Sequence, residues 1–167
     1  MANLATADHA AQGNSARGRS PYMVQNTIDI AAAIVLKGSD FAANDTMEVL
    51  NVPAGTVILS AGIEIMTQLD GTCTLDMGFT GASPAAVDVF VDGLDVVGGA
   101  VGAYGTTPAT EAAQVQVIST ADTIDVKFAT ETDVTSGKLR FWAILMDVSD
   151  MGAHDMIAAS ADRDYLA

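Results

Sequence analysis

Residues 57–67 read VILSAGIEIMT, an apolar run that begins just after a Pro-Ala-Gly turn sequence. Side chains of a β-strand alternate between its two faces. The odd-numbered face is wholly apolar and is predicted to be buried: Val57, Leu59, Ala61, Ile63 and Ile65. The even-numbered face is mixed: Ile58, Ser60, Gly62, Glu64 and Met66. Gly62 predicts a bulge or bend where this strand turns a corner of the fold.

Short strand patterns separated by turn residues continue on both sides of this run. Nine segments are predicted as strands: 22–30, 31–36, 46–50, 57–67, 73–79, 87–93, 114–118, 123–128 and 138–148. Asp70-Gly71 predicts a hairpin to the strand that follows it, and residues 119–122 predict a second hairpin. Because no long amphipathic helix pattern occurs, the chain is predicted to be all-β. The expected architecture is an antiparallel β-sandwich or jelly roll of about eight strands, with extended N- and C-terminal arms.

The chain of 167 residues divides by composition into one domain and two arms. Residues 1–20 are polar and small, and alone such an arm should be disordered. The β-sandwich domain is expected over 21–149, and a C-terminal tail over 150–167. Residues 93–113 form a Gly-rich connection, whose length suggests a functional loop or one that a partner orders.

The net charge of −14 is unevenly placed along the chain. Residues 41–126 contain eleven acids and no Lys or Arg, whereas residues 1–40 are neutral and residues 127–167 carry −3. A phosphate-binding surface needs clustered Lys and Arg, so nucleic acid is not an expected partner. No run approaches the ~20 apolar residues of a membrane span, so no membrane partner is expected either.

Few side chains in the predicted β domain suit catalysis. Both histidines, His9 and His154, lie in the arms, which leaves the domain without a titrating base for acid–base or nucleophilic chemistry. A histidine-based metal site and a phosphate loop are also missing from the pattern. The single cysteine, Cys73, is interpreted as a small residue filling a strand position rather than a reactive thiol. No enzymatic activity and no cofactor are therefore predicted.

Carboxylates leave two alternatives open. Asp88, Asp92 and Asp95 could bind Ca²⁺ through oxygen ligands, or they could be a solvated strand end. A pair of carboxylates could also serve a glycosidase, although Trp142 is the only Trp available as a sugar platform.

The predicted strands carry more apolar side chains than a single core needs, and this feature is more informative than the carboxylates. In residues 138–148 one face is predicted to be core, and it consists of Leu139, Phe141, Ala143 and Leu145. The opposite face is also apolar, and it is predicted to contact another subunit: Trp142, Ile144, Met146 and Val148. Ile58 and Met66 are secondary candidates for the same oligomer interface.

Several stretches occur in an order that resembles small tailed-phage virion proteins. They are VPAGTVILSAGIEIMT, CTLDMGF, DVFVDG, TADTIDVKF and TSGKLRFWAILMDVS, and they span residues 50–150. Chains of this kind resemble capsid decoration (cement) proteins. The resemblance implies a structural homotrimer on the outer capsid surface of the virion, bound between capsomers of the major capsid protein, with no enzyme activity.

The N-terminal arm is also expected to bind the capsid, and two other functions remain as hypotheses. Arg17 and Arg19, in the N-terminal arm, are predicted to pair with acidic groups on a capsid subunit, and two solvated charges are the alternative. A tail- or fibre-associated β-module involved in host attachment is a second functional hypothesis. A non-viral binding module or a hydrolase on the same fold is a third.

Overall fold

The computed structural model describes residues 21–80, 86–105 and 116–148. Within these residues the chain forms nine strands and one helix. They are β1 (Tyr22–Asp29), α1 (Ile30–Lys37), β2 (Thr46–Val52), β3 (Thr56–Thr67), β4 (Thr72–Phe79), β5 (Ala86–Asp95), β6 (Tyr104–Gly105), β7 (Gln116–Ile118), β8 (Asp122–Thr132) and β9 (Lys138–Asp147).

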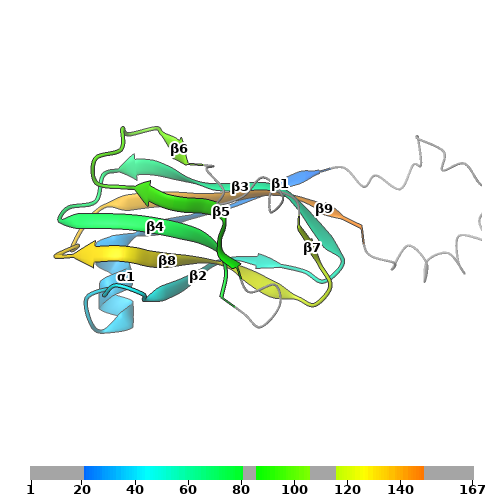
Figure 1. Cartoon of the computed structure of the whole chain (residues 1–167), viewed down its shortest axis with the longest axis horizontal. Helices are drawn as coiled ribbons and strands as arrows, with labels where there is room; N and C mark the ends of the chain where they lie inside the picture. Colours follow the sequence, from blue (N-terminus) through cyan, green and yellow to red (C-terminus); the bar gives the residue numbers. More distant parts are fainter. Residues whose placement is uncertain (1–20, 81–85, 106–115, 149–167) are drawn as a thin grey trace, which may run out of the picture.

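Two antiparallel sheets form the architecture. Sheet A has the strand order β1-β9-β3-β6, with β7 also paired to β3, and sheet B has the order β2-β8-β4-β5. If β7 is set aside, the remaining eight strands follow the order of a jelly roll, in which the chain crosses repeatedly between the two sheets. The all-β antiparallel sandwich predicted from the sequence is confirmed. The start of β1 and the end of β9 lie at one end of the sandwich, and α1 lies at the other (Figure 1).

The core lies between the inner faces of the two sheets, where alternate residues of each strand meet. In β9 the predicted core face is confirmed, since Leu139, Phe141, Ala143 and Leu145 have no exposed surface. Aromatic rings add to the packing: Phe41 stacks on Phe128 with centroids 4.3 Å apart. Removing any of these large side chains from water contributes about 1.5–3 kcal/mol to folding.

The predicted core face of β3 is confirmed at Ala61, Ile63 and Ile65, and the structure differs from it at the start of the strand. The register with β9 shifts between Ile58 and Ser60, so an extra residue, Leu59, forms a bulge there. A bulge moves the following residues to the opposite face. Ile58 therefore faces the core together with Ala61, while Val57 lies on the outer face opposite Met146.

The bulge predicted at Gly62 was therefore misplaced. Gly62 pairs in regular register with Trp142, and the second shift lies between Ile65 and Thr67. Leu59 is half-buried, so its predicted place in the core face was also wrong.

Residues 31–36 form most of helix α1 and not the predicted strand. Asp29 caps the helix by accepting a hydrogen bond from the N–H of Ala32 at 3.3 Å. Gly38 ends it in the left-handed conformation, with φ of 79°. A run of alanines between these two caps favours the helix, and Ile30 anchors it in the core.

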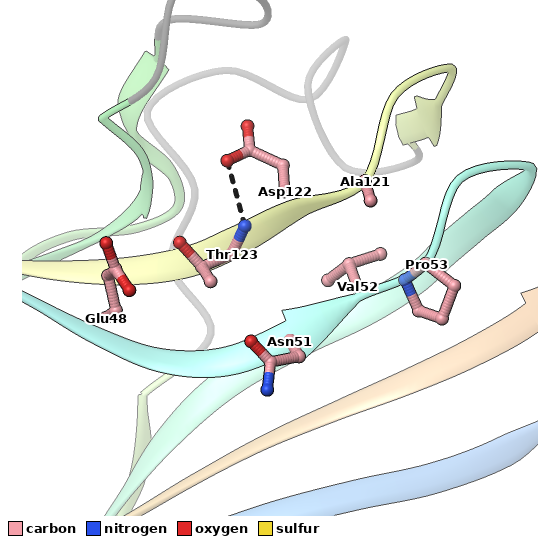
Figure 2. Close-up of a pocket in the computed structure, with 7 residues that line it drawn as sticks. All are labelled: Glu48, Asn51, Val52, Pro53, Ala121, Asp122 and Thr123. Atoms are coloured by element: carbon pink, nitrogen blue, oxygen red, sulfur yellow. Dashed lines mark hydrogen bonds between the residues drawn. The ribbon is translucent and has the colours of Figure 1, made fainter.

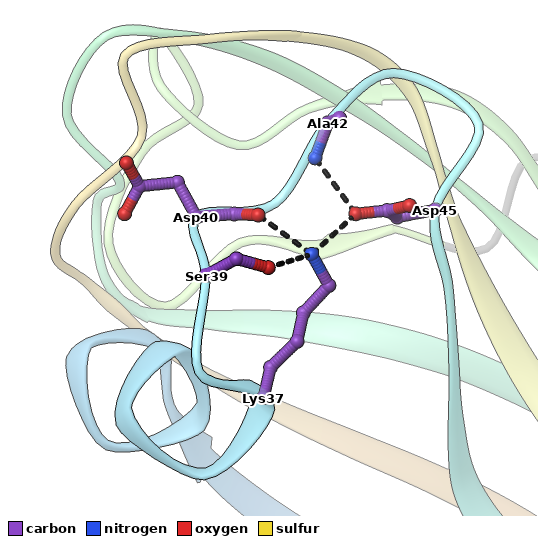
Figure 3. Close-up of polar contacts among 5 residues, drawn as sticks. All are labelled: Lys37, Ser39, Asp40, Ala42 and Asp45. Atoms are coloured by element: carbon purple, nitrogen blue, oxygen red, sulfur yellow. Dashed lines mark hydrogen bonds and ion pairs between the residues drawn. The ribbon is translucent and has the colours of Figure 1, made fainter.

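A lysine network holds the connection from α1 to β2 (Figure 3). The Nζ atom of Lys37 donates to Ser39 Oγ at 2.9 Å and to the carbonyl of Asp40 at 2.6 Å. It also pairs with Asp45 Oδ2 at 2.8 Å. The hydrogen bond from Lys37 is the main cause that lowers the pKa of Asp45, and a hydrogen bond from the N–H of Ala42 lowers it further.

Both predicted hairpins were wrong. Asp70-Gly71 joins β3 in sheet A to β4 in sheet B, so it is a connection between sheets. Gly71 has φ of 71°, and a Cβ there would lie 2.2 Å from the carbonyl oxygen of Thr132. Asp70 accepts hydrogen bonds from the N–H groups of Thr135 and Ser136. Residues 119–122 likewise join β7 in sheet A to β8 in sheet B.

The predicted Gly-rich connection lies partly within the described residues. It contains strand β6, which pairs with β3 through Gly105 opposite Ile63 and Tyr104 opposite Glu64. Residues 106–115 lie outside the described residues, as do residue 149 and the two predicted arms over 1–20 and 150–167.

Candidate interaction surface

The outer face of sheet A carries apolar side chains in adjacent rows. The register places Ile144 between Met23 of β1 and Ser60 of β3. The next row contains Met146 beside Val57, which is itself buried, and the strand after it adds Val117. Met23 and Val117 are 56% and 62% exposed, so the edges of this apolar surface are open to solvent. Exposed apolar patches of this kind typically mark interaction sites.

Trp142 lies in the middle of the same face. Its partners on the neighbouring strands are Gln25 of β1 and Gly62 of β3. Gly62 places no side chain beside the indole. The ring of Tyr104 lies 6.1 Å away between centroids. The indole Nε1 is enclosed, and it finds no hydrogen-bond partner among the residues that the structure describes. An enclosed donor without a partner costs about 1–3 kcal/mol, and such groups often mark functional positions.

The charges on this face are matched. Arg140 and Glu64 approach to 2.9 Å, and Lys138 and Asp29 approach to 3.5 Å. Although Glu64 Oε2 is close to the guanidinium, no N–H points at it, so the contact is an ion pair without an aligned hydrogen bond. The outer face of sheet A therefore combines apolar rows with neutralised charges, which suits contact with another protein.

The predicted interface residues fall into two groups. Ile144, Met146, Val148 and Met66 are half-buried, and Trp142 is 9% exposed. Their part in an oligomer interface stays a prediction. Ile58 is wrong as a candidate, because the bulge turns it into the core with no exposed surface.

Sequence reasoning missed other members of the surface. Met23, Tyr104 and Val117 join it only through strand pairing, since nothing in their local sequence relates them to β9 or β3. Two further exposed apolar residues, Val35 and Leu36, project from α1. Arg17 and Arg19 lie outside the described residues.

Sheet B presents a different surface, because its strands carry eight acids against one lysine, Lys127, a net of −7. The strands of sheet A carry three acids against two cations, a net of −1. Two of the sheet B carboxylates are buried, and they accept hydrogen bonds. Asp125 accepts from the N–H of Thr80 at 3.1 Å and from Thr123 Oγ1 at 2.6 Å. Asp76 accepts from the N–H of Gly93 at 2.9 Å.

A shallow hollow lies on the β2–β8 side of sheet B (Figure 2). Its lining consists of Glu48, Asn51, Val52, Pro53, Ala121, Asp122 and Thr123. The polar groups are two carboxylates, an amide and a hydroxyl, and Asp122 already accepts from the N–H of Thr123 at 2.9 Å. No lining residue is a histidine, cysteine, lysine or arginine.

Across 21–80, 86–105 and 116–148, no three His, Cys, Asp or Glu side chains gather closely enough to hold a metal ion. In the same part of the chain, no helix has the length and hydropathy to cross a bilayer. Burial is the main cause that raises the pKa of Cys73 to about 12, and the negative charges of Glu131 and Asp95 contribute to the increase. At neutral pH this thiol is protonated and unreactive, as predicted for a core residue.

Chains from phage capsid structures share this fold. One from the cyanophage Pam1 capsid asymmetric unit matches with a TM-score of 0.54 and 14% identity, over 86% of this chain and 97% of that chain. One from the capsid of Ralstonia phage GP4 matches with a TM-score of 0.53 and 18% identity, over 78% and 85%. A chain from the Helicobacter pylori bacteriophage KHP30 capsid matches more loosely, with a TM-score of 0.43 and 15% identity, over 74% and 86%. No protein-family model and no curated protein sequence matches the chain.

Proposed function

We propose that the chain is a structural virion protein that decorates the outer surface of a phage head. In this proposal it binds between capsomers of the major capsid protein and performs no catalysis. The observation that carries the proposal is the shared fold with chains from the Pam1 and GP4 capsid structures, at TM-scores of 0.54 and 0.53. The match covers 97% of the Pam1 chain, so the likeness extends over a whole chain of that capsid.

The asymmetry between the sheets supports a specific orientation. The nearly neutral, apolar outer face of sheet A would meet neighbouring subunits, and sheet B, with its net of −7, would face solvent. Burying apolar side chains stabilises an interface, whereas a strongly acidic surface favours solubility. We also propose that the protein is a homotrimer, and this part of the proposal rests on the sequence resemblance to decoration proteins.

Arg17 and Arg19 complete the proposal on the N-terminal side. An arm that becomes ordered on contact can cover a large surface, and arginine pairs well with carboxylates in two-pronged geometry. Deleting residues 1–20 should therefore lower the occupancy of the protein on phage heads. Unchanged occupancy would remove the arm from the proposal.

Binding to heads that lack the protein tests the function directly. Added wild-type protein should bind at high copy number and raise the temperature at which the heads break, because it binds the assembled shell and not free subunits. Ile144→Lys should reduce occupancy, since it places a charge in the apolar rows of sheet A. Glu48→Lys, on sheet B, is the matched control and should bind normally. A handful of copies per particle would instead indicate the tail- or fibre-associated module.

A further inference from the structure

Among the described residues, four strand edges bound the two sheets, and three of them are protected against pairing with another chain. Exposed edges carry unpaired N–H and C=O groups, and proteins block them with short strands, bulges or charges. On one side of sheet A, β6 and β7 have only two and three residues. In sheet B, β2 has a bulge after an exposed Glu48. The other edge, β5, has two register shifts and carries Asp88 and Asp92.

Strand β1 has none of these protections. It pairs with β9 over eight residues without interruption, from Tyr22 opposite Leu145 to Asp29 opposite Lys138. Its first seven residues contain no charge, proline or glycine. Tyr22 is 42% exposed, and most of the other side chains of the strand are exposed as well. A long, regular and uncharged edge of this kind is a ready template for a further strand.

We propose that β1 is a self-association site, at which β1 of a second copy adds antiparallel and joins two copies of sheet A into one continuous sheet. A two-fold axis perpendicular to the sheet keeps each face on its own side, so paired residue numbers must be both odd or both even. Pro21 cannot donate a backbone hydrogen bond, and Asp29 is the first charge and caps α1. The uncharged run between these two residues is centred on Gln25.

This centre defines the register. Gln25 lies opposite its own copy, and on either side of it Val24 lies opposite Asn26 and Met23 opposite Thr27. Tyr22 then lies opposite Ile28, and Asp29 falls opposite Pro21, where the ladder ends. Every pair within the ladder is uncharged, and the two glutamine side chains can exchange amide hydrogen bonds across the axis.

Charge favours this edge over the two edges of sheet B. Each chain carries −14, and sheet B contributes a net of −7, so contacts through sheet B bring like charges together. At β1 the only charge is Asp29, which Lys138 neutralises at 3.5 Å. The remaining repulsion between copies is long-range and screened by salt, so association should strengthen as ionic strength rises.

Introducing a positive or a negative charge at Gln25, the residue on the two-fold axis, tests both the site and its register. Wild-type full-length protein should sediment at a mass equal to an even number of chains, even if sheet A also forms trimers. Gln25→Lys and Gln25→Glu, studied separately, each place like charges face to face and should weaken association about a hundredfold. An equimolar mixture of the two variants should restore the wild-type mass. Asn51→Lys, an exposed change on the β2 edge, is the control and should leave the mass unchanged.

Three results would overturn the pairing. They are a wild-type mass equal to an odd number of chains at high concentration, unaltered masses of the two variants, and failure of the folded variants to restore the mass on mixing. Hydrogen exchange adds a second readout, because alternate amides of β1 should be protected only in the associated state. The pairing is measured without phage heads. A protein that binds heads but does not pair overturns only this inference, and one that pairs but does not bind heads overturns only the proposed function.

Discussion

Sheet A and sheet B have the same kind of inner face and opposite outer faces. Both bury aliphatic and aromatic side chains in one core, yet the strands of sheet A carry a net of −1 and those of sheet B a net of −7. The fold depends on the inner faces, because their burial provides the main stabilising free energy. The outer faces are free to differ, and the proposed orientation of the molecule rests on their difference.

Polar groups also act differently on the two sheets. On sheet A, Glu64 and Asp29 pair with cations of β9. On sheet B, Asp125 and Asp76 accept hydrogen bonds from neighbouring backbone and hydroxyl groups, which fastens the segment after β4 and the end of β5. Acids in sheet B therefore contribute to the fold as well as to the charge of the surface.

The largest expected effect is on stability, and it differs between the inner and the outer face of sheet A. Ile58→Ala should lower the free energy of unfolding by about 2–5 kcal/mol, because it leaves a cavity beneath β3. Ile144→Ala, on the outer face, should cost less than about 1 kcal/mol. Urea unfolding of both variants measures the difference. Equal losses would contradict the change of face at the Leu59 bulge.

The second test concerns the buried acids of sheet B. Asp125→Ala should destabilise the protein by about 2–3 kcal/mol, because it leaves the Thr80 N–H and the Thr123 hydroxyl without their acceptor. The exposed Glu48, which lies opposite Asp125, is the matched control, and Glu48→Ala should change stability by no more than about 0.5 kcal/mol. Thermal unfolding at neutral pH distinguishes them. A neutral Asp125→Ala would mean that the acids of sheet B only provide charge.

A smaller effect is expected at the corner between the sheets, and it depends on pH. Hydrogen bonds from the Thr135 hydroxyl and the N–H groups of Thr135 and Ser136 hold the pKa of Asp70 well below its usual value. A lowered folded-state pKa contributes stability that is fully present above about pH 4, the value of an unfolded Asp, and is lost as the pH falls further. Wild type should therefore lose more stability than Asp70→Asn on acidification. Parallel curves of unfolding temperature against pH would contradict this role.

The smallest effect is expected at the loop after α1, which lies at the end of both sheets. Lys37→Met removes the main cause of the lowered pKa of Asp45. The carboxyl should then titrate closer to its ordinary value, while the unfolding temperature changes little because exposed ion pairs contribute weakly. NMR titration of Asp45 measures the shift. An unchanged pKa would assign the lowering to the Ala42 N–H instead.

Local pattern was sufficient wherever a strand is regular. In β9 the period of two assigned Leu139 and Phe141 to the core and Trp142 and Ile144 to the other face. It holds because β9 itself has no extra residue: its register with β1 is unbroken, and both shifts in its pairing with β3 lie on the β3 side. The sequence also places both histidines outside the predicted β domain and leaves residues 41–126 without Lys or Arg. Composition and alternation together thus determined the all-β class.

Tertiary structure decided whatever depends on a partner strand. The bulge at Leu59 exists only in the register with β9, and it alone sends Ile58 inward and Val57 outward. Asp70-Gly71 suits a hairpin and a connection between sheets equally well, since both need a tight turn with a positive φ. Likewise the outer face of sheet A comprises Met23, Trp142 and Tyr104, residues distant in the chain that only strand pairing makes neighbours. Sequence determined which residues are apolar, and pairing determined which of them share a surface.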